Sequence, residues 1–125
     1  MRSVKIFAAA VAVSGLATGL LITPAQAATG YDRCPANHMC LFSGLNGTGT
    51  IAAYTSGSQD TSEQGITKAP SGWNRTTSQW CAYEGGSYRG IATQVHPAGR
   101  KGNDPSWNIH PVYSIKKKSG NCVPS

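Results

Sequence analysis

The chain has 125 residues, a formal net charge of +6 and only five acidic residues. This length allows one small domain after removal of a leader. The basic residues are dispersed, except for Lys116, Lys117 and Lys118. Such a run suits an anionic partner, but the favoured interpretation is a solvated strand end. The dense basic stripe with interleaved aromatic residues that marks nucleic-acid binding is absent, so we expect no nucleic-acid partner.

The first 27 residues have the layout of a secretory signal peptide. Arg2 and Lys5 precede the apolar run IFAAAVAVSGLATGLLI, and TPAQA follows with small residues at its end. This layout predicts cleavage after Ala27. A membrane anchor is the alternative, because the run approaches the roughly 18 residues that a span needs. We expect an exported domain of residues 28–125 in which nine basic residues face five acidic ones, a net charge of +4, with no membrane association after cleavage.

Four cysteines follow the cleavage site. An even number in a small exported chain indicates a disulfide framework. Zinc binding is not favoured, because no C-x-x-C or H-x-x-x-H pair accompanies the cysteines. We therefore expect two disulfides, which would stabilise a domain with a small core. These residues are Cys34, Cys40, Cys81 and Cys122.

The exported segment is predicted to form short β-strands. Gly, Ser, Thr, Asn and Pro interrupt it every few residues, which disfavours helices. Between them, runs rich in aromatic and β-branched residues alternate and predict strands with one buried face. In chain order these runs are HMCLF (38–42), TGTIAAY (48–54), SQWCAYE (78–84), RGIATQV (89–95) and PVYSIK (111–116). Residues 55–72 are expected to form a loop with one short turn or strand. Many short strands with turn signals predict an all-β sandwich or barrel.

The alternation also predicts which side chains of two strands share a face. Met39 and Leu41 should point one way, opposite to Cys40 and Phe42. Trp80 and Ala82 should likewise point one way, opposite to Cys81 and Tyr83.

Two stretches of the chain repeat each other. MCLFSGLNGTG (39–49) overlays WCAYEGGSYRG (80–90), and each copy consists of strand, tight loop and strand. Gly49 falls on Gly90, where a hairpin is expected to press its backbone against the aromatic ring of the preceding strand. Only glycine permits such an approach or a positive φ without strain. The alternative is two unrelated hairpins with common turn residues.

The second copy resembles a known pattern. Its residues Tyr83, Glu84, Tyr88 and Gly90 form Y-E-x-x-x-Y-x-G, similar to the Greek-key signature of βγ-crystallin domains. The first copy has Phe42 and Gly49 at matching places. It departs from the pattern at Ser43, where Glu is usual, and at Gly47, where an aromatic residue is usual.

Further stretches resemble one exported family. They are CP-x4-CLF from Cys34, SGWNRT (71–76), and WN with the following YSIK (107–116). Together they are similar to the secreted bacterial peptidase-inhibitor family typified by the streptomycete metalloproteinase inhibitor. The resemblance extends over nearly all of residues 34–118.

This resemblance implies a single βγ-crystallin-like sandwich of two Greek-key motifs, at about residues 34–77 and 78–122. In that architecture the last strand lies beside the first strand of its own repeat. This would bring Cys122 near Cys81 and leave Cys34 with Cys40.

The resemblance also raises the question of calcium. In calcium-binding members, a short acidic or Asn-rich run that ends in two hydroxyl residues supplies the oxygen ligands. Here Ile66, Thr67, Ile109 and His110 stand where Asn or Asp would be needed. We therefore expect no cofactor, with calcium as a minor alternative. A second alignment offers oxygens at Asn74, Thr77 and Ser78.

The sequence predicts a binding protein and not an enzyme. G-x-S-x-G, H-E-x-x-H and a spaced carboxylate pair are all absent, and His38, His96 and His110 are scattered. By the family resemblance, we expect a secreted, monomeric inhibitor of an extracellular peptidase, specifically a metallopeptidase. The alternatives are an exported antimicrobial or toxin-like βγ-crystallin protein and a calcium-binding structural or envelope protein. Candidate inhibitory loops are Thr55–Ser71 and Pro97–Asn108, either of which could instead be an inert connection.

Overall fold

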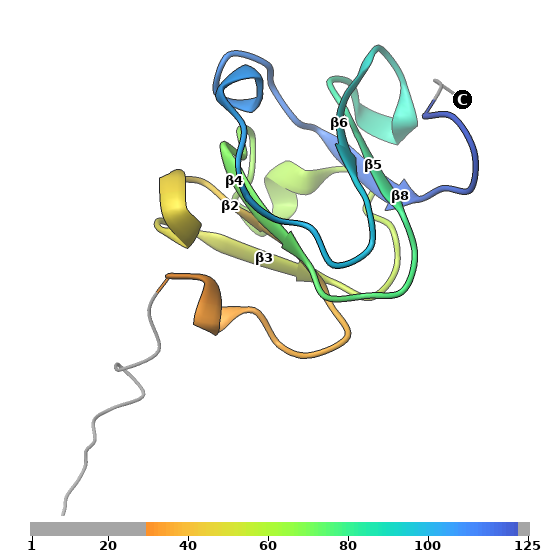
Figure 1. Ribbon diagram of the computed structural model, residues 1–125. Helices are drawn as coiled ribbons and strands as arrows, with labels where there is room; N and C mark the ends of the chain where they lie inside the picture. Colours follow the sequence, from red (N-terminus) through yellow and green to blue (C-terminus); the bar gives the residue numbers. More distant parts are fainter. Residues whose placement is uncertain (1–29, 123–125) are drawn as a thin grey trace, which may run out of the picture.

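The computed structural model describes residues 30–122, in which short strands are joined by single turns of 3-10 helix (Figure 1). The predicted signal peptide, residues 1–27, lies outside the described residues. The strands are Met39–Phe42 (β2), Ile51–Tyr54 (β3), Ser71–Asn74 (β4), Trp80–Tyr83 (β5), Ala92–His96 (β6), Lys101–Asn103 (β7) and Ser114–Lys117 (β8). The 3-10 turns are Gly30–Arg33 (η2), Leu45–Gly47 (η3), Thr61–Gln64 (η4), Gly86–Tyr88 (η5) and Pro105–Asn108 (η6). The described part of the chain has no helix long and apolar enough to cross a membrane.

The strands form two antiparallel sheets, with the orders β3-β2-β4-β7 and β6-β5-β8. In Figure 1 the sheet that contains β2, β3 and β4 lies beside the one that contains β5, β6 and β8. The predicted all-β fold is confirmed, and two sheets around a shared core are consistent with a sandwich. The crystallin-like Greek-key topology stays a prediction from the resemblance.

Each sheet includes a contribution from the other half of the chain. β7 follows β5 and β6 in the sequence but pairs with β4, where Gly72 lies opposite Gly102. In return, Ser58 of the first half forms an isolated antiparallel bridge with Ile115 of β8. The two halves are therefore joined by backbone hydrogen bonds as well as by their core.

The core lies between the sheets and confirms the predicted inward faces. Met39 and Leu41 of β2 and Trp80 and Ala82 of β5 are completely buried in one cluster. Full burial of a large apolar side chain contributes about 1.5 to 3 kcal/mol. The other members of this cluster are Ala52, Tyr54, Ile66, Ala69, Val112 and Ile115.

The outward-facing side chains of β2 and β5 are buried too, which corrects the expectation of one buried face per strand. On β2, Phe42 makes an edge-to-face contact with Tyr31 of η2, with 5.4 Å between the ring centroids. On β5, Tyr83 makes a similar contact with Tyr88 of η5 at 6.1 Å. Short surface segments therefore cover both central strands from outside, and this covering is not encoded in the strand's own alternation.

The two repeated stretches fold into the same hairpin. In each, the backbone N–H of the first loop glycine donates to the carbonyl four residues later, at 3.0 Å in Gly44–Thr48 and 2.9 Å in Gly85–Arg89. The middle residue of each 3-10 turn adopts the left-handed conformation, with φ of 57° at Asn46 and 54° at Ser87. The structure therefore confirms that the two copies are one repeated unit.

A buried serine anchors each hairpin to a neighbouring strand. Ser71 Oγ of β4 donates to the carbonyl of Gly44 at 2.7 Å and accepts from the amide of Gly47 at 2.9 Å. Ser114 of β8 makes the same two bonds to the second hairpin, at 2.6 and 2.8 Å. Each hydroxyl thus satisfies two backbone groups that would otherwise lack a partner.

Gly49 and Gly90 adopt the positive φ expected of them, 78° and 77°. The expected approach to an aromatic ring is wrong. A Cβ on Gly90 would lie 3.3 Å from the amide nitrogen of Gly85 and 3.4 Å from Cγ of Glu84. The hairpin therefore folds back onto its own first residues, and the glycine is needed for its φ and for that close return.

β4 begins at the end of the loop-like stretch 55–72, for which one short turn or strand was expected, and β7 lies where no strand was predicted. Gly72 occupies the second position of β4, and a Cβ there would lie 3.1 Å from both the carbonyl oxygen of Cys40 and Cε1 of His96. Gly102 is the middle residue of the three-residue β7. A glycine in this position removes the side chain that would reveal a half-buried strand by alternation.

Candidate functional site

The first predicted inhibitory loop, Thr55–Ser71, is fastened to the second sheet. Ser58 exchanges two backbone hydrogen bonds with Ile115, at 2.8 and 2.9 Å. The buried Thr61 hydroxyl lies 2.8 and 2.9 Å from two carbonyl oxygens further along the chain. Residues 55–57 precede these anchors and remain exposed. The loop therefore presents a short tip between fixed ends, together with the turn η4.

The second predicted loop, Pro97–Asn108, is also built into the fold because it contains β7 and η6. Trp107 of η6 is buried, with the Arg100 guanidinium 4.3 Å from its ring centroid. The amide of Gly99 donates to the carbonyl of Asn74 at 2.9 Å, which fixes the turn at residues 97–100. Residues 97–99 of this turn are exposed, and both predicted loops are anchored to the sheets along their length.

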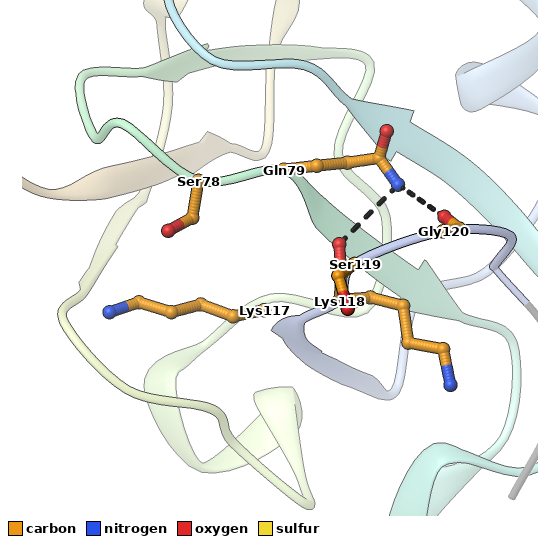
Figure 2. A pocket seen from close by; sticks show the side chains of 6 residues that line it. All are labelled: Ser78, Gln79, Lys117, Lys118, Ser119 and Gly120. Atoms are coloured by element: carbon orange, nitrogen blue, oxygen red, sulfur yellow. Dashed lines mark hydrogen bonds between the residues drawn. The ribbon is translucent and has the colours of Figure 1, made fainter.

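A third loop, which the sequence reasoning missed, is Lys118–Cys122, hereafter the stapled loop. Its first amide, on Lys118, donates to the carbonyl of Gln79 at 3.0 Å. The side-chain amide of Gln79 returns a hydrogen bond to the carbonyl of Gly120 at 2.8 Å (Figure 2). A disulfide to Cys81 of β5 holds the end of the loop. The available signal was a lysine run that leads through a glycine to a paired cysteine.

The disulfides have the predicted pairing. Cys34 pairs with Cys40 and Cys81 pairs with Cys122, with Cα–Cα distances of 5.9 and 5.7 Å. Cys40 lies on β2 and Cys81 on β5, in different sheets. Each bridge connects a central strand to a segment that carries no strand hydrogen bonds of its own. The disulfides therefore restrain the two ends of the domain, mainly by limiting the unfolded chain.

The Greek-key motif residues build hairpins and do not form a chemical site. Glu84 is half-buried and contributes its amide to the carbonyl of Ile91 at 2.9 Å. The hydroxyl of Tyr83 is buried without a hydrogen-bond partner, and burial raises its pKa. The hydroxyl of Tyr54, in the core, is in the same situation, and burial raises its pKa as well. Both tyrosines serve as packing groups.

Asn74, the one amide among the calcium candidates, does not offer a free side-chain oxygen. Asn74 Oδ1 accepts from the amide and the hydroxyl of Thr76, at 3.0 and 2.7 Å, and its Nδ2 donates to the carbonyl of Ser78 at 2.7 Å. At the positions where the family's calcium-binding members carry acids or amides, Ile66 is completely buried and Ile109 is 71% exposed. Neither side chain can bind a hard cation, so these residues do not fit a calcium site.

The titratable groups are used structurally. His96 is fully buried and its Nε2 hydrogen-bonds Gln94 Oε1 at 2.9 Å; burial lowers its pKa to about 3. Asp104 caps η6 by accepting from the hydroxyl and the amide of Ser106, at 2.7 and 2.9 Å, and these bonds lower its pKa. Among residues 30–122, no group of three or more His, Cys, Asp or Glu could hold a metal ion.

These features define a class of protein: a small, disulfide-linked, two-sheet domain whose loops are preordered for contact with another molecule. The chain matches peptidase inhibitor family I36 over residues 27–95, more than half of its length, and it belongs to that family. It is therefore a peptidase inhibitor. No curated protein matches the chain closely enough to count as a relative. The stapled loop lies outside the matched residues.

Proposed function

We propose that this protein is exported as a monomer and blocks an extracellular metallopeptidase without catalysing a reaction itself. Family membership supports inhibition over the toxin-like and the calcium-binding structural alternatives. The resemblance of the CP-x4-CLF and SGWNRT stretches to the streptomycete type supports the narrower metallopeptidase target. Two disulfides are in keeping with an oxidising, extracellular setting.

The observation that carries the proposal is the fastening of every candidate loop to a sheet. Thr55–Ser71 is held by the bridge at Ser58, and Pro97–Asn108 by β7 and by the buried Trp107. A loop that is already ordered avoids much of the cost of association, about 0.5 to 1.5 kcal/mol for each side chain that would otherwise be immobilised. Rigid loops can therefore fill a peptidase cleft with little loss of entropy.

The test is inhibition of a panel by the refolded, oxidised protein of residues 28–125. The panel contains a thermolysin-like metallopeptidase, a subtilisin-like enzyme and a trypsin-like enzyme. We expect saturable inhibition of the metallopeptidase at micromolar protein or below, and no effect on the other two. Inhibition of only a serine peptidase would contradict the metallopeptidase target, and inhibition of none would contradict the proposal as a whole.

The matched control is the same protein after reduction and alkylation of its cysteines. We expect inhibition to be lost, because loss of a native disulfide typically costs a small exported domain about 2 to 5 kcal/mol, so the domain that holds the loops in place should unfold. Full inhibition by the reduced protein would show that preordered loops are not the mechanism. In that case the inhibitory function would be retained and the rigid-loop mechanism would be refuted.

A further inference from the structure

We propose that the stapled loop and the hollow beside it bind a carboxylate side chain from an acidic segment of the target peptidase. The identity of the partner rests on the proposed function. The chemistry of the site rests on the structure alone. The site would act as a second contact, apart from the cleft-filling loops, that attracts and orients the partner.

The hollow has a volume of about 360 Å³ and lies where β5 begins and β8 ends. This volume is large enough for one side chain and a few waters, but too small for a folded segment. Figure 2 shows its polar walls, with the Gln79 side chain reaching across to the loop backbone. The lining residues are Ser78, Gln79, Lys117, Lys118, Ser119 and Gly120.

The lining is cationic and contains no acidic residue. In Figure 2 the side chain of Lys117 extends below Ser78, while that of Lys118 extends to the opposite side of the loop. Within residues 30–122, Arg100 pairs with Asp104, and no carboxylate of these residues forms an ion pair with Lys117 or Lys118. Two ammonium groups that flank one hollow produce a positive potential suited to a single negative charge.

Two carbonyl oxygens of the stapled loop lie beside the side-chain amide of Gln79. Gln79 Nε2 donates to the carbonyl of Gly120 at 2.8 Å and lies 3.5 Å from that of Lys118. The hydrogen-bond donors that line the hollow are the hydroxyls of Ser78 and Ser119 and the two lysine ammoniums, of which that of Lys117 also lies 5.7 Å from the centroid of the Trp80 ring. All of them can donate hydrogen bonds. The site is therefore complementary to an acceptor with negative charge, such as a carboxylate.

The remaining basic residues argue for a short acidic peptide segment over a long polyanion. Arg75 and Lys101 lie on the other sheet, where both contact the Trp73 ring at 4.5 and 4.6 Å from its centroid. The outward side of that sheet is thus a separate cationic surface whose charges are engaged in packing. A polyanion needs a continuous basic track, and the dispersed charge does not supply one.

The experiment is a titration of 15N-labelled residues 28–125 with a capped hexapeptide of Asp and Gly, followed by NMR. We expect saturable shifts of the backbone amides of Ser119 and Gly120 and of the side-chain amide of Gln79. Raising the salt concentration from about 0.02 M to about 0.3 M should weaken binding severalfold, because exposed charges are screened over about 10 Å at 0.1 M. The same peptide with Asn in place of Asp should cause no saturable shift.

Variants separate the local site from net charge. Lys117→Ala with Lys118→Ala should weaken binding about tenfold, since each exposed ion pair contributes up to about fivefold in affinity. Lys68→Ala with Arg89→Ala removes the same charge at two exposed positions elsewhere and should leave binding unchanged. Equal weakening by both double variants would overturn the proposal, because it would reduce the effect to overall charge.

Other outcomes of these experiments also test the proposal. Shifts confined to Trp73 and its neighbours would place acid binding on the other sheet and refute the site. Competition at Gly120 by a sulfated oligosaccharide that binds more tightly than the peptide would assign the site to a polyanion and refute the partner class. Peptide binding by a protein that inhibits no peptidase in the panel would keep the carboxylate site and remove the proposed function. Inhibition without peptide binding would keep the proposed function and refute the carboxylate site.

Discussion

Replacing His96 by Gln should remove most of the acid sensitivity of folding between neutral pH and pH 4.5. The imidazole lies 4.4 Å from the Trp107 ring, centroid to centroid, and its Nε2 contacts Gln94 Oε1 at 2.9 Å. Gln94 donates its amide group to the carbonyl of Ala69 at 3.1 Å, so its oxygen accepts from His96 and Nε2 carries the proton. Burial, together with the Arg100 guanidinium, lowers the pKa of His96 to about 3.

The direction of the pH effect on stability follows from the protonation of His96 in the unfolded and the folded states. The unfolded chain binds a proton at this histidine below pH 6.5, whereas the folded protein excludes it down to a pKa of about 3. The free energy of unfolding therefore decreases as the pH falls from 6.5 to 3. At pH 4.5, two pH units below the unfolded pKa, the loss is about 2 to 3 kcal/mol. The lowered pKa of Asp104 adds a loss below about pH 4, which every variant shares.

The assay is urea unfolding at pH 7 and pH 4.5, monitored by tryptophan fluorescence, with His110→Gln as the control. His96→Gln should start from a lower stability at pH 7, because it loses the contact with Trp107. On acidification it should then lose about 2 to 3 kcal/mol less than the wild type. The control should keep the wild-type difference. Equal acid losses in all three proteins would show that His96 is not held neutral in the folded state.

Ser71→Ala and Ser114→Ala should lower the free energy of unfolding by similar amounts. Each leaves two backbone groups unsatisfied and should cost about 1 to 3 kcal/mol in urea unfolding. The control, Ser62→Ala at an exposed position, should cost less. Unequal losses would argue against equivalent hairpins. Gly90→Val should lower the melting temperature more than Gly120→Val: both positions have positive φ, but a Cβ meets the hairpin at Gly90 and nothing within 4 Å at Gly120. Equal shifts would contradict this reasoning. Millimolar calcium should leave the melting temperature nearly unchanged; a gain near 2.7 kcal/mol, which needs ligand at about a hundredfold its dissociation constant, would reveal a site.

Sequence alone predicted what local patterns encode. The strands around Cys40 and Cys81 alternate clearly, and the copied hairpin loops share glycines whose φ is positive, so the core faces and the repeat could be predicted. β4 and β7 could not, because Gly72 and Gly102 interrupt the alternation and only the neighbouring strand explains them. The burial of His96 likewise depends on a tertiary contact, with Trp107 of η6. The features that sequence reasoning missed are those that tertiary contacts determine and local patterns do not.

The candidate site, like the fold, was predicted only in part from the sequence. The two predicted loops exist, but their fastening depends on long-range contacts, such as Ser58 with Ile115, that no local pattern encodes. The stapled loop was missed for a related reason. Its lysines look like a solvated strand end until the disulfide and Gln79 bring them around one hollow. A charge run acquires a specific role only when its backbone is held in place.

The first repeat's departure from the crystallin-like pattern at Gly47 has a physical cause. A Cβ on Gly47 would lie 2.5 Å from the amide nitrogen of Tyr31, so the N-terminal turn η2 occupies the space that a side chain would need. Tyr31 then places its ring edge-to-face on Phe42 at 5.4 Å, as Tyr88 does on Tyr83 at 6.1 Å in the second repeat. The aromatic residue missing from the first hairpin is thus supplied by the segment before Cys34. The first structural unit therefore includes η2, which precedes the first cysteine, and Gly47 leaves the space that Tyr31 occupies.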